Sequence, residues 1–375
     1  MNICFEEPNN DQFTNVSSFN LEESLHEEQK YDHDLYNKKL DAFLQNASFP
    51  LVIVGSLKED ERNDVILFLE SLGAPVYIEA ISGIREDPRV QHLRIARSQN
   101  LWQAAARAQY PIDGILRIGG IPTLRLWRDL EEKKENILHF SINESPFSGL
   151  SWGEIVPIPP RIFFPSYKNK ISISSERTLR WLSEDKIYQM KLLELFSEEP
   201  LAEPSLIHNL SKKIPRNSLV YLGNSLPIRE WDLASTYEKR GYLHFANRGV
   251  NGIDGQTSTF LGLAQPEQSN WALLGDLTTL HDATAPWILP QIAPATVNLV
   301  VINNGGGKIF APLFSLEELQ NCHHIRFPSL ATLWNMNYEE WRTIPKNLSC
   351  YGNHLIEMMP DEEASRRFID KLRQI

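Results

Sequence analysis

The chain has 375 residues, 42% of them hydrophobic, and a formal net charge of −11. This length favours two domains, or three small ones, and the negative charge argues against nonspecific nucleic-acid binding, which needs a basic face. No apolar run approaches the roughly 18–20 residues that span a membrane. The three cysteines, Cys4, Cys322 and Cys350, lack metal-ligand spacing, which is typical of a reducing, cytosolic protein without a disulfide framework.

The first half of the chain begins with an acidic, polar stretch at 9–35, which predicts a linker or surface arm. A short apolar run at 51–54 ends at a glycine and predicts a buried strand. A charged segment with helical periodicity follows at 58–72, and a second strand is predicted at 76–79. A strand, a helix and a strand in this order form a βαβ unit, which implies a parallel sheet.

The same pattern recurs further along the chain. A strand is predicted at 114–118, a helix at about 122–134 and another strand at 137–140. The stretch 157–170 is rich in proline and aromatic residues, and we interpret it as a surface connection. Residues 33–185 are therefore assigned to one Rossmann-like α/β domain.

The second half of the chain opens with a helix predicted at 176–198. Four predicted strands follow, and each ends in a cluster of small or polar residues. They lie at 218–222, 242–245, 271–274 and 297–302. Because ligands of open parallel sheets bind at the carboxyl ends of the strands, these clusters predict one polar site. A dinucleotide-binding site is disfavoured, since no G-x-G-x-x-G sequence follows a predicted strand.

Two of these strand ends carry groups that suit a metal ion. Asp276 follows the third strand and Asn304 the fourth, 28 positions later, which leaves room for one helix and a returning strand. A carboxylate, an amide oxygen and the backbone carbonyl of Gly306 are hard oxygen ligands of the kind that Mg²⁺ takes together with phosphate. Alternatively, the aspartate caps a helix and the Asn-Asn-Gly-Gly run forms a simple turn.

The motifs around these residues resemble the MenD family of thiamine-diphosphate enzymes. The resemblance covers nearly the whole chain in order. It rests on GNSLPIR at 223–229, NRGVNGIDG at 247–255, GDLT at 275–278, HD at 281–282 and NNGGGKIF at 303–310. It implies two thiamine-diphosphate-type domains with mainly parallel sheets, and a thiamine diphosphate held through Mg²⁺ or Mn²⁺.

The resemblance also implies roles for particular residues. Asp276, Asn304 and the Gly306 carbonyl would hold the metal, although counting forward from Asp276 favours Asn303 and Gly305 instead. Ile253 would support the bent cofactor and Phe310 would pack near the reacting carbons. The full set of cofactor-binding residues is Gly249, Asn251, Gly252, Ile253, Gly275, Asp276, Leu277, Thr278, Asn304, Gly306 and Gly307.

The substrates implied by the resemblance are 2-oxoglutarate and isochorismate. Ser225, Arg229, Arg248 and Arg125 would line their pocket, and guanidinium groups match carboxylates with two parallel hydrogen bonds. The implied reaction, a step of menaquinone biosynthesis, decarboxylates 2-oxoglutarate and adds the remaining unit to isochorismate. His323 and His324, beside Cys322, are interpreted as only superficially similar to a metal cluster, because no second cluster follows at ligand spacing.

Residues 2–8 resemble the end of the pyrimidine-binding domain of this superfamily. We therefore expect a domain tail and linker at 1–32, a middle domain at 33–185 and a diphosphate-binding domain at 186–375. We expect the chain to act as a homo-oligomer, such as a homodimer, or with a pyrimidine-binding domain supplied separately. Two alternatives stay open: another thiamine-diphosphate 2-oxo-acid decarboxylase or synthase, and an inactive fragment or partner subunit.

Overall fold

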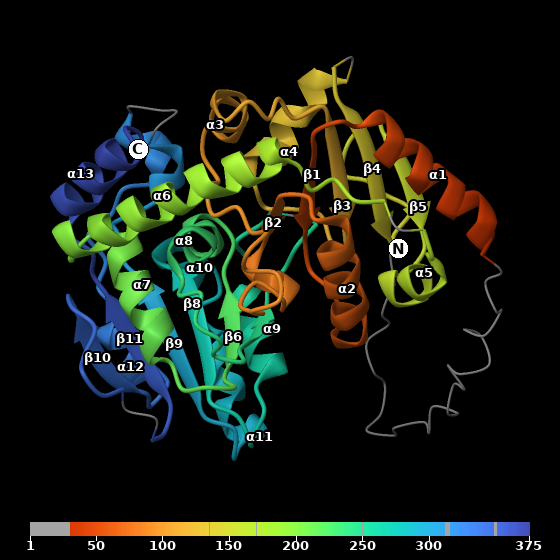
Figure 1. Ribbon diagram of the computed structural model, residues 1–375. Coiled ribbons are helices and arrows are strands. Elements are labelled where there is room, and N and C mark those ends of the chain that lie inside the picture. Colours follow the sequence, from red (N-terminus) through yellow and green to blue (C-terminus); the bar gives the residue numbers. More distant parts are fainter. Residues whose placement is uncertain (1–30, 135, 170, 250, 312–315, 349–350) are drawn as a thin grey trace, which may run out of the picture.

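The computed structural model describes residues 31–375 except 135, 170, 250, 312–315 and 349–350. Over this part of the chain the strands form two parallel sheets, and helices cover both faces of each sheet (Figure 1). The predicted α/β class, with mainly parallel sheets flanked by helices, is confirmed. The predicted end of a preceding domain, at 2–8, lies outside the described residues.

The first lobe is built on a five-stranded sheet with the order β2-β1-β3-β4-β5. Its strands are β1 (Pro50–Val54), β2 (Val76–Ile78), β3 (Gly114–Ile118), β4 (Leu138–Asn143) and β5 (Glu154–Pro157). Because side chains alternate along a strand, Val52 and Val54 of β1 enter one core while Leu51 and Ile53 enter the other. Both faces of the sheet are therefore buried, as expected of a parallel sheet.

Helices on the two faces complete this lobe. One face is covered by α1 (His33–Asn46), α2 (Arg62–Leu72) and α5 (Pro160–Ser166). The other is covered by α3 (Leu101–Arg107), α4 (Arg125–Asp129) and the start of α6 (Glu176–Glu198). The interpretation of 157–170 as a surface connection is wrong, because α5 buries Phe163 and Phe164 in the first core.

The second lobe is built on a six-stranded sheet with the order β10-β11-β9-β8-β6-β7. Its strands are β6 (Leu219–Leu222), β7 (Leu243–Phe245), β8 (Asn270–Gly275), β9 (Val297–Ile302), β10 (Asn337–Trp341) and β11 (His354–Met358). The first four correspond to the four predicted strands, and the last two were not predicted. Strand order reverses between β6 and β8, and such a switch point is where open α/β sheets bind ligands.

Helices also cover both faces of the second sheet. One face packs against the rest of α6, α7 (Glu203–Lys213), α8 (Leu226–Ala234) and α13 (Glu362–Leu372). The other packs against α9 (Gln256–Leu263), α10 (Asp276–His281), α11 (Leu289–Ile292) and α12 (Pro328–Leu333). Short 3₁₀ helices lie at Glu59–Glu61, Ala80–Ser82, Leu130–Lys133, Ala285–Ile288, Lys308–Phe310 and Glu317–Gln320.

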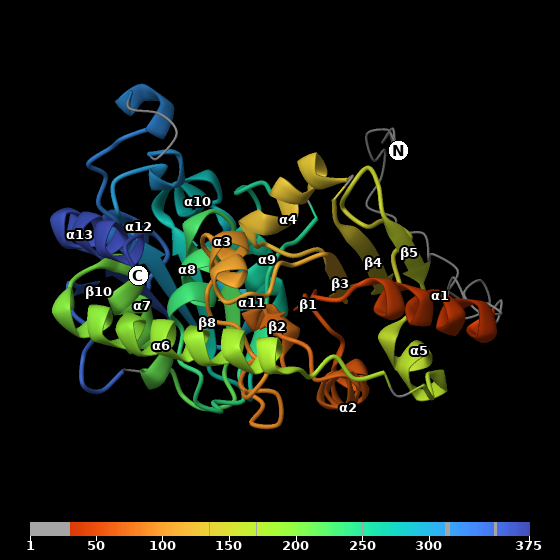
Figure 2. The same ribbon diagram turned by 45° about the horizontal axis from the view of Figure 1, so that its top comes forward.

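The long helix α6 belongs to both lobes. Figure 2 shows it running alongside both of them. Trp181 near its start packs in a core of the first lobe, whereas Leu192 and Leu195 further along pack in a core of the second. The predicted domain boundary at 185/186 thus falls inside one continuous helix, at the place where the helix passes from one core to the other. The boundary itself stays a prediction.

The two lobes also meet through polar contacts near the carboxyl ends of their strands. The backbone N–H of Ala80, just after β2, donates to Asp232 Oδ1 of α8 at 2.7 Å. The buried Arg85 of the first lobe donates to the Asp232 carbonyl at 2.8 Å and to Ser235 Oγ at 2.6 Å. These contacts hold the strand ends of the first lobe against α8.

Candidate functional site

Asp276 lies at the centre of the loops that follow β8 and β9. Its side chain is buried, and Oδ1 accepts a hydrogen bond from Leu277 N at 2.6 Å. Oδ2 accepts from the N–H groups of Gly305 and Gly306, both at 2.9 Å. Burial raises the pKa of Asp276, while these N–H donors and His323 act in the opposite direction. One carboxylate therefore joins the two loops that the sequence predicts to meet.

The two asparagines after β9 point into different surroundings. Asn303 Nδ2 donates to Glu357 Oε1 at 2.6 Å and to the Ile325 carbonyl at 2.8 Å. Asn304 Nδ2 donates to Glu203 Oε2 at 2.9 Å. Asn304 Oδ1 is buried and has no hydrogen-bond partner among the described residues. Of the two predicted alternatives, Asn304 is the one with a buried amide oxygen that lacks a hydrogen-bond partner among the described residues.

The glycines of this loop allow a tight backbone path. Gly306 has a φ of 136°, and a Cβ on it would lie 2.8 Å from the Asn321 carbonyl oxygen. A residue with a side chain would be strained there both by conformation and by contact. Gly307 N donates to the Gln320 carbonyl at 2.5 Å, and the Gly306 carbonyl accepts from Lys308 N at 2.9 Å, so it keeps a second lone pair.

These groups fit a magnesium ion that carries a diphosphate. A carboxylate, an open amide oxygen and a carbonyl are the oxygen donors such an ion takes. Within the described ranges, no group of three or more His, Cys, Asp or Glu side chains could hold a metal. The predicted set contains only one residue of these types, Asp276, so it stays a prediction.

His323 also reaches Asp276, which the sequence did not predict. Its Nε2 lies 3.3 Å from Asp276 Oδ2, and its Nδ1 accepts a hydrogen bond from Ile325 N at 3.1 Å. Because Nδ1 is the acceptor, Nε2 is the nitrogen that carries the ring hydrogen, and it forms no hydrogen bond with a described residue. The two residues are 47 positions apart in the sequence, and no local spacing signals their contact.

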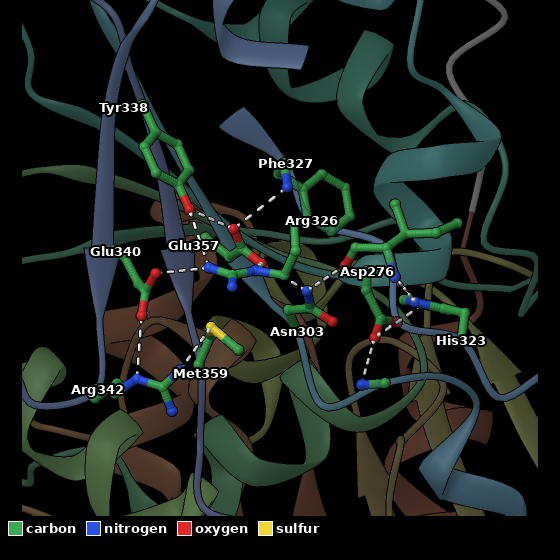
Figure 3. A network of polar contacts seen from close by, with 12 residues as sticks. Asp276, Asn303, His323, Arg326, Phe327, Tyr338, Glu340, Arg342, Glu357 and Met359 are labelled. Atoms are coloured by element: carbon green, nitrogen blue, oxygen red, sulfur yellow. Dashed lines mark hydrogen bonds and ion pairs between the residues drawn. The ribbon is translucent and has the colours of Figure 1, made fainter. Parts of the chain in front are cut away.

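A polar network holds the loop that carries His323. Figure 3 shows this network beside Asp276. Glu357 of β11 is fully buried and accepts from Arg326 Nε at 2.7 Å, from Tyr338 Oη at 2.5 Å and from Asn303. Burial would raise the pKa of Glu357, but the hydrogen bonds from Arg326, Tyr338 and Asn303 lower it on balance. The network therefore fixes Asn303 away from the predicted metal position.

Two further acidic side chains lie behind Asn304. Glu203, the first residue of α7, is 4% exposed and contacts both Asn304 and Glu230. Burial raises the pKa of Glu203. Burial and then the neighbouring Glu203 raise the pKa of Glu230 well above its usual range. Neither glutamate was predicted from the sequence. A Glu at a helix start, such as Glu203, is a common surface feature, and Glu230 lies inside α8 without a local signal of its contact.

A second group of predicted residues converges on Asn224, just after β6. Arg248 Nη1 donates to Asn224 Oδ1 at 2.8 Å, and Asn224 Nδ2 donates to the Gly252 carbonyl at 2.8 Å. Arg229 Nη1 donates to the Ser225 carbonyl at 2.5 Å. Ser225 has a φ of 75°, an uncommon conformation that is concentrated at functional sites. The structure thus brings together Ser225, Arg229, Arg248 and Gly252.

One predicted substrate arginine, Arg248, affects the pKa of the other, Arg229. Desolvation, and then the charges of Arg248 and Arg128, lower the pKa of Arg229. Desolvation also lowers the pKa of Arg248, whereas Glu79 and Asp232 act in the opposite direction. Arg248 Nε is buried without a hydrogen-bond partner among the described residues. This part of the site therefore holds positive charge close together, with a donor left open.

The remaining predicted residues lie around these two groups. Phe310 is 44% exposed, so it is not an ordinary core residue. Thr278 is buried, and Ile253 and Leu277 are half-buried. Gly275 ends β8, while Gly249 and Asn251 are exposed between β7 and α9. Arg125 is the first residue of α4; its side chain lies outside the described part of the structure.

A pair of buried carboxyl groups lies between the lobes near Arg248. Thr123 Oγ1 is 2.6 Å from Glu79 Oε1 and 3.1 Å from Asp232 Oδ2. Burial, and then the charge of Asp232, raise the pKa of Glu79 to about 8. The Thr123 hydroxyl has one hydrogen, so it can donate to only one of the two carboxyl groups at a time. A proton held by the carboxyl pair satisfies the second contact. No local pattern signals this contact, which joins the residue after β2, the loop after β3 and α8.

The fold and site define a two-lobed α/β protein with a polar ligand site at its strand ends. No family model matches the chain. The chain is 40% identical over 341 residues to the 2-succinyl-5-enolpyruvyl-6-hydroxy-3-cyclohexene-1-carboxylate synthase of Bdellovibrio bacteriovorus, covering 88% of this chain and 62% of the relative. It is 31% identical over 331 residues to the synthase of the same name from Akkermansia muciniphila, covering 84% and 60%. The chain is thus similar to this synthase family over most of its own length.

The chain spans about three fifths of the length of these relatives, as the 62% and 60% coverage shows. None of the helices in the described ranges combines the length and apolar character needed to cross a membrane.

Proposed function

We propose that the protein acts in menaquinone biosynthesis as a 2-succinyl-5-enolpyruvyl-6-hydroxy-3-cyclohexene-1-carboxylate synthase. It would take 2-oxoglutarate and isochorismate as substrates and use thiamine diphosphate with Mg²⁺ or Mn²⁺. Thiamine diphosphate supplies the electron sink for decarboxylation when it is bound. The similarity to curated synthases of that name over 88% of the chain supports the reaction class.

The observation that carries the proposal is the open oxygen of Asn304. Asn304 Oδ1 is buried without a partner among the described residues, and the adjacent Gly305 and Gly306 N–H groups bind Asp276. A buried polar atom left unpaired costs about 1–3 kcal/mol, so it is expected to have a ligand in the working protein. Asp276, Asn304 and the Gly306 carbonyl would hold the metal, and Gly275, Leu277, Thr278 and Gly307 would approach the diphosphate.

The group around Asn224 would bind the substrates. Arg229 and Arg248 would pair with substrate carboxylates, since a guanidinium group donates two parallel hydrogen bonds to a carboxylate. Desolvation lowers the pKa of both arginines, and the charge of Arg248 lowers that of Arg229 further, so a bound carboxylate would compensate partly desolvated cations. Ser225 would add a hydroxyl donor, and Arg125 would join them from the start of α4. Gly249, Asn251, Gly252 and Ile253 would support the cofactor, with Phe310 beside the reacting carbons.

Calorimetry and a product assay together test the proposal. The full chain should bind thiamine diphosphate in the presence of Mg²⁺, and Asp276→Ala should weaken this binding by at least about tenfold, the loss typical of a disturbed metal site. Product should form from 2-oxoglutarate and isochorismate, and pyruvate should not replace 2-oxoglutarate. Absence of cofactor binding would refute the assignment. Cofactor binding without product would favour a partner-subunit role, and turnover of pyruvate would favour a different 2-oxo-acid enzyme.

A further inference from the structure

Glu203 occupies an unusual position for a carboxylate. It is 4% exposed and lies 101 positions before Asn304 in the sequence, on a different element. Taking a carboxylate out of water is costly unless hydrogen bonds compensate it. One oxygen, Oε2, accepts from Asn304 Nδ2 at 2.9 Å, while Oε1 is buried without a hydrogen-bond partner among the described residues. Because burying this carboxylate is unfavourable, we expect the Glu203 side chain to have a role beyond beginning α7.

The contact determines which end of the Asn304 amide faces Glu203. An asparagine amide presents a donor, Nδ2, on one side and an acceptor, Oδ1, on the other, and a half-turn exchanges them. A carboxylate only accepts hydrogen bonds, so it selects the orientation with Nδ2 toward itself. Asn304 Oδ1 is then directed away from Glu203, and it is this atom that is buried and open.

The same loop is held from the other side by Asp276. Its Oδ2 accepts from the N–H groups of Gly305 and Gly306, which directly follow Asn304. The backbone of the loop is therefore fixed by Asp276, and the remaining freedom is the rotation of the Asn304 side chain. The hydrogen bond to Glu203 removes that freedom.

We propose that Glu203 is a positioning residue of the metal site, which acts by orienting the Asn304 amide so that Oδ1 is presented to the cation. This inference rests on the metal assignment of the proposed function. It adds a residue from α7 that touches neither metal nor substrate. Partners that orient metal ligands in this way affect metal affinity by about 10- to 100-fold when they are removed.

Mn²⁺ binding tests the inference without any measurement of turnover. The free Mn²⁺ signal in electron paramagnetic resonance gives the affinity of the full chain in the presence of thiamine diphosphate. Glu203→Met keeps the approximate length of the side chain but removes the acceptor, and should weaken Mn²⁺ binding about 10- to 100-fold. Glu203→Gln retains a carbonyl that can accept from Asn304 Nδ2, so it should stay within a few fold of the wild type.

Two controls separate positioning from general damage. Glu199→Met removes another buried glutamate four positions away, at the end of α6, which pairs with Arg367 and Lys371 of α13 and not with Asn304. It should leave Mn²⁺ affinity unchanged even if it lowers stability. In an Asn304→Ala background, Glu203→Met should cause no further loss of affinity, because the amide it orients is gone. If Glu203→Met does not fold, Glu203→Ala replaces it.

The outcomes distinguish this inference from the proposed function. A wild-type chain that binds no Mn²⁺ refutes the metal assignment itself. A wild-type chain that binds Mn²⁺, with equal affinity in Glu203→Met, refutes the positioning role while the metal site stands. Loss of affinity in Glu203→Gln as large as in Glu203→Met also contradicts the proposal, because the acceptor would then be irrelevant.

Discussion

Single polar side chains connect the loops of the candidate site over long distances in sequence. Asp276 holds the loop after β9, and Glu357 of β11 holds both Asn303 and Arg326. Each of these carboxylates is buried, so its hydrogen bonds are not exchanged for water and their loss leaves unpaired groups in the interior. The geometry of the site therefore depends on a few residues that need not touch a ligand.

Glu357→Gln should be strongly destabilising. It removes the charge of a buried carboxylate that accepts hydrogen bonds from Arg326, Tyr338 and Asn303, and a buried group left without its partner costs about 1–3 kcal/mol. The Arg326 side chain is 41% exposed, so its own charge remains solvated. Denaturant unfolding monitored by tryptophan fluorescence would measure the loss. Glu363→Gln, which affects only an exposed pair with Arg366, serves as the control and should change stability little. Equal behaviour of the two variants would mean that the network around Glu357 is unimportant to the fold.

Residue-level prediction from the sequence succeeds where the chemistry is local. Asp276 and Asn304 each follow a strand, so topology alone predicts that they share a sheet edge. Glu203, His323 and Glu357 carry no such signal. Their partners lie on other elements, and a single glutamate or histidine in a sequence does not reveal which distant backbone will approach it.

At the scale of elements, the close approach of the segments that follow β1 and β3 depends on glycine. Gly55 follows β1, and a Cβ added to it would lie 2.2 Å from the Gly120 carbonyl oxygen. The atom in the way is backbone, which cannot move aside as a side chain can. The backbone at position 55 can therefore lie this close to the Gly120 carbonyl only because residue 55 has no side chain.

Gly55→Ala should lower the free energy of unfolding by about 3 kcal/mol, the upper range for forced overpacking. Gly262→Ala is a matched control in α9, where an added Cβ meets nothing within 4 Å. It should be neutral or stabilise by about 0.5–1 kcal/mol through helix propensity. Thermal unfolding of both variants checks the prediction, which fails if Gly55→Ala unfolds at the wild-type temperature.

Strands and helices with strong patterns were predicted well from the sequence. The apolar runs of β3 and β9 and the periodic helix α6 were predicted at the bounds observed. β10 was not, because its adjacent Glu339 and Glu340 interrupt the apolar pattern of an edge strand. α5 was missed because proline and aromatic residues suggested a loop, whereas Phe163 and Phe164 form part of the core.

At the scale of the whole molecule, the carboxyl pair between the lobes makes stability depend on pH. The pKa of Glu79 is raised from 4.5 to about 8, first by burial and then by Asp232. Between these values the folded protein binds a proton that the unfolded chain has lost. The stabilisation is therefore complete below about pH 4.5 and is lost as the pH rises through about 8.

Glu79→Gln should flatten this dependence. In the wild type the free energy of unfolding should fall by up to about 1.4 kcal/mol per pH unit between pH 6 and 8, the limit for one proton. The variant keeps a neutral side chain and should lose most of that slope, leaving the part due to Asp232. Urea unfolding at a series of pH values measures both slopes. Glu144→Gln, at an exposed pair with Lys58, is the control, and identical slopes in all three proteins would contradict the prediction.

Helix α6, which both lobes share, limits where the chain can be divided into separate fragments. A cut at 185/186 would divide α6 in its middle. Trp181 would remain in the first fragment and Leu192 in the second, each on a short piece of helix that is no longer held by the rest of α6. The fragment that keeps the whole helix would expose to water the apolar side chains that pack in the other lobe. The other fragment would lose the helix that covers part of its core. Useful truncations should therefore be sought at the ends of α6, with polar replacements on the stretch left uncovered.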